Sequence, residues 1–126
     1  NNGIVEIELG SFNNLIGLLD LFLSNNSIQN LDPNLFKDLK FLTSLDLYCN
    51  KFRNVNLNIL KNVNSLKFLF IDKNKINSID NKLLAIELKN LTILSLMLNN
   101  LKFDDLTKER PFMNLINLEK LYLSYN

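Results

Sequence analysis

The stretch Leu42-Thr43-Ser44-Leu45-Asp46-Leu47-Tyr48-Cys49-Asn50 decides the fold. Its apolar and polar residues alternate with a period of two, which predicts a short strand that is buried on one face. The asparagine follows where the backbone turns away from the strand. Because an amide side chain carries donors and an acceptor, it can satisfy backbone groups that such a turn leaves unpaired.

This pattern recurs five times, with first leucines at positions 18, 42, 66, 91 and 118, which are 24, 24, 25 and 27 residues apart. Self-similarity at such a period is the signature of a solenoid. Equivalent strands that are separated by a return segment must pair in parallel. The copies are Leu18, Leu21, Leu23 and Asn26; Leu42, Leu45, Leu47 and Asn50; Leu66, Leu69, Ile71 and Asn74; Leu91, Leu94, Leu96 and Asn99; and Leu118, Leu121, Leu123 and Asn126.

The register also extends backwards, since Asn2 falls on the asparagine position and Ile4 and Ile7 on the next two apolar positions. Residues 1–126 are therefore predicted to form one array of about five repeats. Neither end has the polar outer face of a capping repeat, so we expect an internal fragment whose uncapped ends favour self-association. The predicted ladder of structural asparagines is Asn2, Asn26, Asn50, Asn74, Asn99 and Asn126.

The return half of each repeat is predicted to form turns or short helices. Pro33 suits a turn or the first turn of a helix, and Phe36 and Leu39 share one face at that spacing. Phe12, Phe36 and Phe112 occupy the same repeat position. They should pack beneath the outer side of the array.

The form of residues 18–39 resembles the 24-residue class of the leucine-rich repeat family, and the resemblance covers essentially the whole chain. It implies an α/β fold, a curved solenoid with a parallel sheet on the concave face and loops or short helices on the convex face. It also implies a protein ligand held on the concave surface. This class is frequent in secreted proteins and receptor ectodomains, which suggests an extracellular or cell-surface location.

Composition excludes several classes of function. The formal net charge is +1 and the basic residues are scattered, which argues against a nucleic-acid partner. No run of 18 apolar residues occurs, so no membrane contact is expected. With no histidine and only Cys49, the chain has neither a zinc constellation nor a histidine-dependent catalytic arrangement. We therefore expect no enzyme activity, no metal and no cofactor.

Two features remain open to a sharper interpretation. The longest interval between two copies of the motif contains a dense charge cluster, Asp104-Asp105 and Lys108-Glu109-Arg110. This cluster favours a solvated loop. The alternative is a contact loop or a pair of carboxylates that binds a metal ion. Cys49 favours an inert, partly buried thiol, with a reactive or intermolecularly bonded one as the alternative.

Side chains between the inward leucines should point outward onto the concave face. An ordinary solvated face would be mostly polar, so the aromatic and apolar residues here indicate an interaction surface. The alternative is that some rings only cover neighbouring strands. The predicted ligand-binding residues are Phe22, Asp46, Tyr48, Phe68, Phe70, Asp72, Ile93, Met97, Tyr122 and Tyr125.

These observations favour a protein-recognition module of an extracellular receptor, adhesion or matrix protein. A cytoplasmic adaptor or scaffold is the first alternative. The second is the recognition arm of an enzyme whose catalytic domain lies outside these 126 residues.

Overall fold

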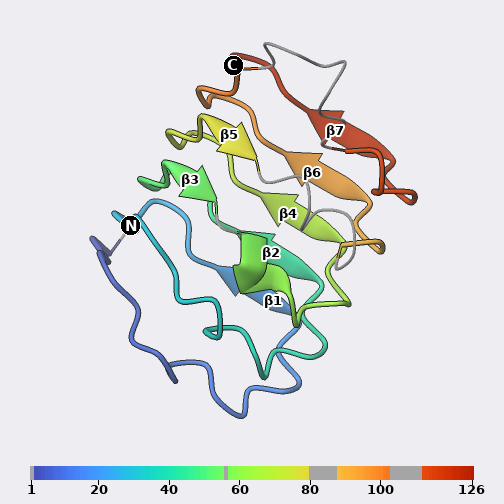
Figure 1. Cartoon of the computed structure of the whole chain (residues 1–126). Coiled ribbons are helices and arrows are strands. Elements are labelled where there is room, and N and C mark those ends of the chain that lie inside the picture. Colours follow the sequence, from blue (N-terminus) through green and yellow to red (C-terminus); the bar gives the residue numbers. More distant parts are fainter. Residues whose placement is uncertain (1, 56, 80–87, 103–111) are drawn as a thin grey trace.

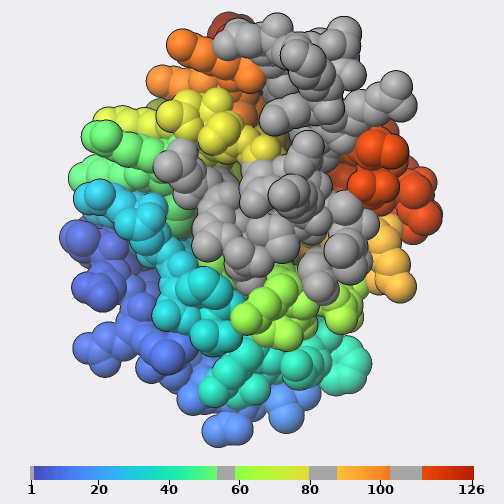
Figure 2. Space-filling model, viewed as in Figure 1, coloured from blue at the N-terminus to red at the C-terminus, as the bar shows by residue number. Residues whose placement is uncertain are grey.

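A computed structural model of the chain describes residues 2–55, 57–79, 88–102 and 112–126. Five short strands form one parallel sheet in the order β1-β2-β4-β6-β7, which is also their order in the sequence (Figure 1). In the space-filling view the colours follow the chain along the stack, so each repeat lies against the repeats next to it in sequence (Figure 2). The strands are Asp20–Phe22, Ser44–Asp46, Phe68–Phe70, Ile93–Ser95 and Lys120–Tyr122.

The register of the sheet pairs equivalent positions of successive repeats. Leu21 is opposite Leu45, Leu45 is opposite Leu69, and the same row continues to Leu94 and Leu121. These inward leucines are fully buried in the three central strands. The regular spacing of the motif along the chain therefore places these leucines in a continuous apolar column inside the stack. Burial of this apolar surface is the main contribution to the stability of the array.

The described return segments form turns, which was one of the two predicted forms, and not short α-helices, which was the other. Hydrogen bonds three residues apart close the turn after Asp32, from Leu35 N–H to Asp32 O at 3.0 Å and from Leu39 N–H to Phe36 O at 3.1 Å. Such i to i+3 bonds define turns and 3₁₀ helices and not α-helices. Among the described residues, the single helical element is the 3₁₀ helix η1, Leu57–Leu60.

A second, two-stranded parallel sheet pairs β3, Asn54–Val55, with β5, Ser78–Ile79. The leucine and asparagine positions of the repeat do not predict this second sheet. Phe12 and Phe36 pack together as expected, with ring centroids 5.9 Å apart and planes tilted by 40°. Phe36 and Leu60, which follow each other at this repeat position, are both fully buried.

Candidate functional site

The outward face of the five-stranded sheet carries six of the ten predicted ligand-binding residues, in two rows set by the strand register. Each row takes one residue from every strand, because alternate side chains of a strand leave the same face. Phe68 lies beside Ile93, and both are half-buried. The first row is Asp20, Ser44, Phe68, Ile93 and Lys120, and the second is Phe22, Asp46, Phe70, Ser95 and Tyr122.

The aromatic residues of the second row do not form one uninterrupted patch. Asp46 separates Phe22 from Phe70, and Ser95 separates Phe70 from Tyr122. Phe22 is 69% exposed, whereas Phe70 is half-buried. The face therefore has a central apolar cluster on β4 and β6, with further exposed rings near its two ends.

Residues just beyond the strands extend this face. Tyr48 and Met97 are half-buried, and Tyr125 is 76% exposed. The Lys73 ammonium lies 5.8 Å from the centroid of the Tyr48 ring, which is within the range of a cation–π contact. This contact orients one face of the Tyr48 ring toward a positive charge.

Asp72, which was predicted as a ligand-binding residue, is buried in the structure. Its side chain is only 9% exposed. Its carboxylate accepts a hydrogen bond from Ser95 Oγ and another from the Met97 N–H, the latter at 2.7 Å. Both donors belong to the next repeat, so Asp72 joins two neighbouring repeats.

The motif asparagines form a hydrogen-bonded column between repeats. Asn74 Oδ1 accepts from Phe52 N–H at 3.1 Å, and Asn74 Nδ2 donates to Leu47 O of the preceding repeat, also at 3.1 Å. Equivalent bonds cross each repeat boundary at Asn50, Asn99 and Asn126. Asn26 Oδ1 accepts from the N–H groups of Asn2 and Ile4, so Asn2 contributes through its backbone.

A row of left-handed residues precedes these asparagines. The φ angles of Asn25, Cys49, Lys73, Leu98 and Tyr125 lie between 52° and 61°. The five residues of this row are of five different types, so the sequence does not predict their left-handed backbone conformation. Cys49 is a free, half-buried cysteine.

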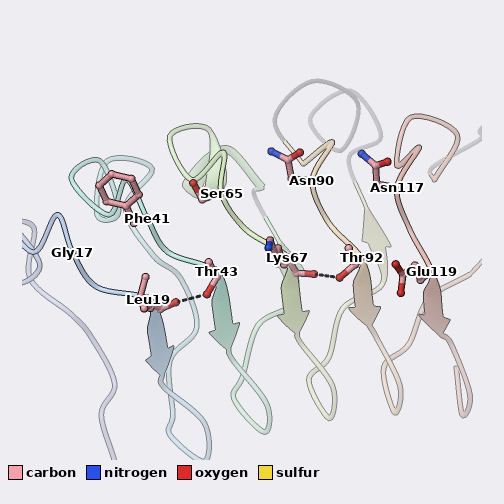
Figure 3. Close-up of a pocket in the computed structure, with 10 residues that line it drawn as sticks. All are labelled: Gly17, Leu19, Phe41, Thr43, Ser65, Lys67, Asn90, Thr92, Asn117 and Glu119. Atoms are coloured by element: carbon pink, nitrogen blue, oxygen red, sulfur yellow. Dashed lines mark hydrogen bonds between the residues drawn. The ribbon is translucent and has the colours of Figure 1, made fainter.

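An open groove crosses all five repeats at the amino-terminal ends of the strands (Figure 3). It has a volume of about 750 Å³. One row of its lining directly precedes the strands, and a second row lies two residues earlier in each repeat. The lining residues are Leu19, Thr43, Lys67, Thr92 and Glu119 in the first row and Gly17, Phe41, Ser65, Asn90 and Asn117 in the second. The alternation of residues within the strands gives no signal for this groove, because its lining residues precede the strands.

Residues 1–52 match a family model described as Leucine rich repeat. The matched segment covers the first two copies of the motif, and the same strand register and asparagine bonds continue through the later copies. Residues 1–52 are therefore leucine-rich repeats. A comparison with curated proteins found no match.

Some sequence-based interpretations lie outside the described residues. The charged cluster of Asp104-Asp105 and Lys108-Glu109-Arg110 is one of them. Over the part of the chain that is described, no group of three or more metal-binding side chains occurs. No helix within the same residues is long and apolar enough to cross a membrane.

Proposed function

We propose that this leucine-rich repeat array is a protein-recognition module that binds a protein ligand on the outward, concave face of its sheet. The family suggests a role in protein interaction. We choose this face because its solvent side carries several large apolar residues, namely Phe22, Phe68, Phe70 and Ile93. A sheet face that meets only water is normally polar, whereas apolar surface patches mark interaction sites.

The centre of the proposed contact is β4, the middle strand of the five. Phe68 and Phe70 project from it, on either side of the buried Leu69. Interface energy concentrates in a few aromatic residues near the middle of a contact. Because the two rings are held by a paired strand, little conformational freedom is lost when a ligand packs on them.

We propose that the module acts by binding and not by catalysis. Leucine-rich repeats are typically non-catalytic interaction modules, and this chain has no histidine. Resemblance of the repeat form to ectodomain repeats supports a setting in an extracellular receptor, adhesion or matrix protein. Antibody staining of intact and permeabilised cells tests that setting, since a cytoplasmic adaptor stains only after permeabilisation.

The test of the binding face compares Phe70→Ala with Lys37→Ala. Lys37 is exposed on the return turn after Asp32, away from the sheet face. Immobilised native chain and both variants are exposed to the same cell extract, and a protein retained by the native chain is purified for titration. We expect Phe70→Ala to weaken binding by about 2 kcal/mol or more, as for a central aromatic contact.

The fold of each variant is checked by circular dichroism. Phe70→Ala should keep it, because the buried Leu69 and Ile71 are unchanged. Loss of binding in Lys37→Ala together with full binding in Phe70→Ala would assign the ligand to the opposite side of the array and reject this proposal.

A further inference from the structure

The groove at the amino-terminal ends of the strands changes in chemistry along its length. Its first end is apolar, with Leu19 and Phe41 both exposed. Lys67 lies at its middle and Glu119 at its far end, and both side chains are exposed. Within the described part of the chain, neither charge has an ion-pair partner. The groove thus presents an apolar surface, a positive charge and a negative charge in that order.

The threonine side chains that line the groove between its apolar end and its two charged residues are held in place by hydrogen bonds to the backbone. Thr43 Oγ1 donates to Leu19 O at 3.1 Å, and Thr92 Oγ1 donates to Lys67 O at 3.1 Å. Each threonine hydroxyl therefore ties the start of one strand to the start of the strand before it (Figure 3). A ligand would meet a lining that is already ordered, which lowers the entropic cost of binding.

Two asparagines add acceptors to one wall. Asn90 Nδ2 donates to Asn64 O at 2.7 Å, and Asn117 Nδ2 donates to Lys89 O at 2.8 Å. Since the nitrogen of each amide is engaged, its Oδ1 is the atom left to accept a hydrogen bond. In a peptide backbone that has no internal hydrogen bonds, these oxygens suit the N–H groups of the residues that are not proline.

We propose that this groove binds an extended, proline-rich peptide segment of a partner protein in the polyproline II conformation. The peptide carries an apolar side chain against Leu19 and Phe41, a carboxylate at Lys67 and a basic side chain at Glu119. This site is separate from the aromatic sheet face. It rests on the proposed role in protein recognition but not on the choice of that face.

The spacing of the groove favours polyproline II over a β-strand. Leu19 and Lys67 are two strands apart, as are Lys67 and Glu119. Neighbouring strands are about 4.8 Å apart, so each interval is roughly 9.6 Å. A polyproline II helix repeats every three residues with a rise of about 3.1 Å, which places equivalent side chains roughly 9.3 Å apart on one side. Side chains on one face of a β-strand recur at about 6.7 Å, which does not match.

The predicted ligand therefore has three key side chains at positions 1, 4 and 7. The order along the groove leaves the direction of the peptide open, so two probes are used. They are the blocked heptapeptides Leu-Pro-Pro-Glu-Pro-Pro-Arg and its reverse, each with a fluorescent label. Binding to the full chain is measured by fluorescence anisotropy at low salt, where exposed charge pairs are least screened.

We expect one of the two peptides to bind saturably and Lys67→Glu to weaken that binding about five- to tenfold, because reversal replaces an attraction with a repulsion. Replacing the peptide's glutamate by lysine should restore binding to Lys67→Glu. The matched control is Lys37→Glu, which makes the same charge change at an exposed position outside the groove lining and should leave the affinity unchanged. Phe41→Ala should weaken binding through the apolar end of the groove.

The proposal is overturned if neither peptide binds up to about 1 mM, the concentration at which binding free energy falls to roughly 4 kcal/mol. Equal weakening by Lys67→Glu and Lys37→Glu would also overturn it, because the effect would then be one of net charge. Phe70→Ala should bind the peptide normally. Peptide binding that persists while no protein binds the sheet face would reject the proposed face and retain the groove.

Discussion

Ile28 donates its backbone N–H to Asn50 Oδ1 across a repeat boundary, over 3.1 Å and 22 residues of sequence. The same amide donates through Nδ2 to Leu23 O of the preceding repeat at 2.9 Å and to Leu47 O of its own repeat at 3.2 Å. Asn50 is buried, so none of these backbone groups has water as a ready alternative. One side chain thus satisfies both kinds of backbone group where the chain leaves the strand.

Removing this amide should destabilise the array. Asn50→Ala and Asn74→Ala each leave a buried N–H and buried carbonyl groups without their partner, at about 1–3 kcal/mol per group. We expect a total loss of roughly 2–4 kcal/mol, measured by denaturant titration.

The control for the ladder is Asn30→Ala, at an exposed position of a return segment. Asn81, in a comparable position by sequence, lies outside the described residues. Asn30→Ala should change the stability by less than about 0.5 kcal/mol. Identical unfolding midpoints for Asn30→Ala and Asn50→Ala would contradict a stabilising role for the column.

Asp72 and Ser95 should be energetically coupled. The Asp72 carboxylate accepts from Ser95 Oγ and from the Met97 N–H, and the Asp72 and Ser95 side chains are buried. Asp72→Ala should cost about 1–3 kcal/mol because both donors lose their partner. In a double-mutant cycle with Ser95→Ala we expect a coupling energy of roughly 0.5–3 kcal/mol.

A coupling near zero would show that the two side chains are merely close together. Asp46→Ala is a useful comparison, because the Asp46 carboxylate accepts from the Tyr48 N–H of its own repeat at 2.8 Å. Asp46 should therefore show no coupling to Ser95 beyond experimental error.

The left-handed row predicts a stabilising substitution. Leu98 has a φ of 54° and is 46% exposed. A leucine in this conformation costs about 1–2 kcal/mol, whereas asparagine adopts it more readily. Leu98→Asn should therefore raise the free energy of unfolding by up to about 1 kcal/mol.

The matched control is Leu15→Asn. Leu15 is 45% exposed, which is nearly the same as Leu98, but its φ is not in the left-handed region. It should give no stabilisation. If Leu15→Asn and Leu98→Asn shifted the unfolding midpoint equally, the gain would come from surface polarity and not from backbone conformation.

The sequence predicted the features that depend on period alone. Five strands, their parallel order and the buried leucine column follow from the spacing of the motif, and the positions that form the asparagine bonds follow from the same spacing. Each copy of the motif produces the same strand, the same buried leucines and the same asparagine position. Recognising the repeat is therefore enough to predict these features in every copy.

Features that depend on differences between repeats were not predicted. Strand alternation correctly places Asp72 on the side opposite the leucines, but only the presence of Ser95 in the next repeat explains its burial. The groove and the pairing of β3 with β5 arise likewise from several repeats acting together. No residue type marks the left-handed row, because turn geometry and not side-chain chemistry sets its conformation.

The two ends of the described sheet differ from its middle in a way that predicts self-association. Leu121 occupies the same row as Leu45, Leu69 and Leu94, which are at most 1% exposed, yet it is 38% exposed. Among the described residues, β1 pairs with β2 alone and β7 with β6 alone, so each outer strand has an unpaired edge. Apolar surface and free strand edges both favour pairing with another chain.

A purified polypeptide of these 126 residues should therefore associate at concentrations on the order of tens of micromolar, the regime in which such surfaces drive assembly. Ile116→Lys, at an exposed position of the last repeat, should reduce the association measured by sedimentation velocity. Phe41→Lys makes a comparable change at an exposed position inside the array and should not reduce it. A non-associating monomer at these concentrations would show that the exposed ends are too small or too polar to drive contact between copies.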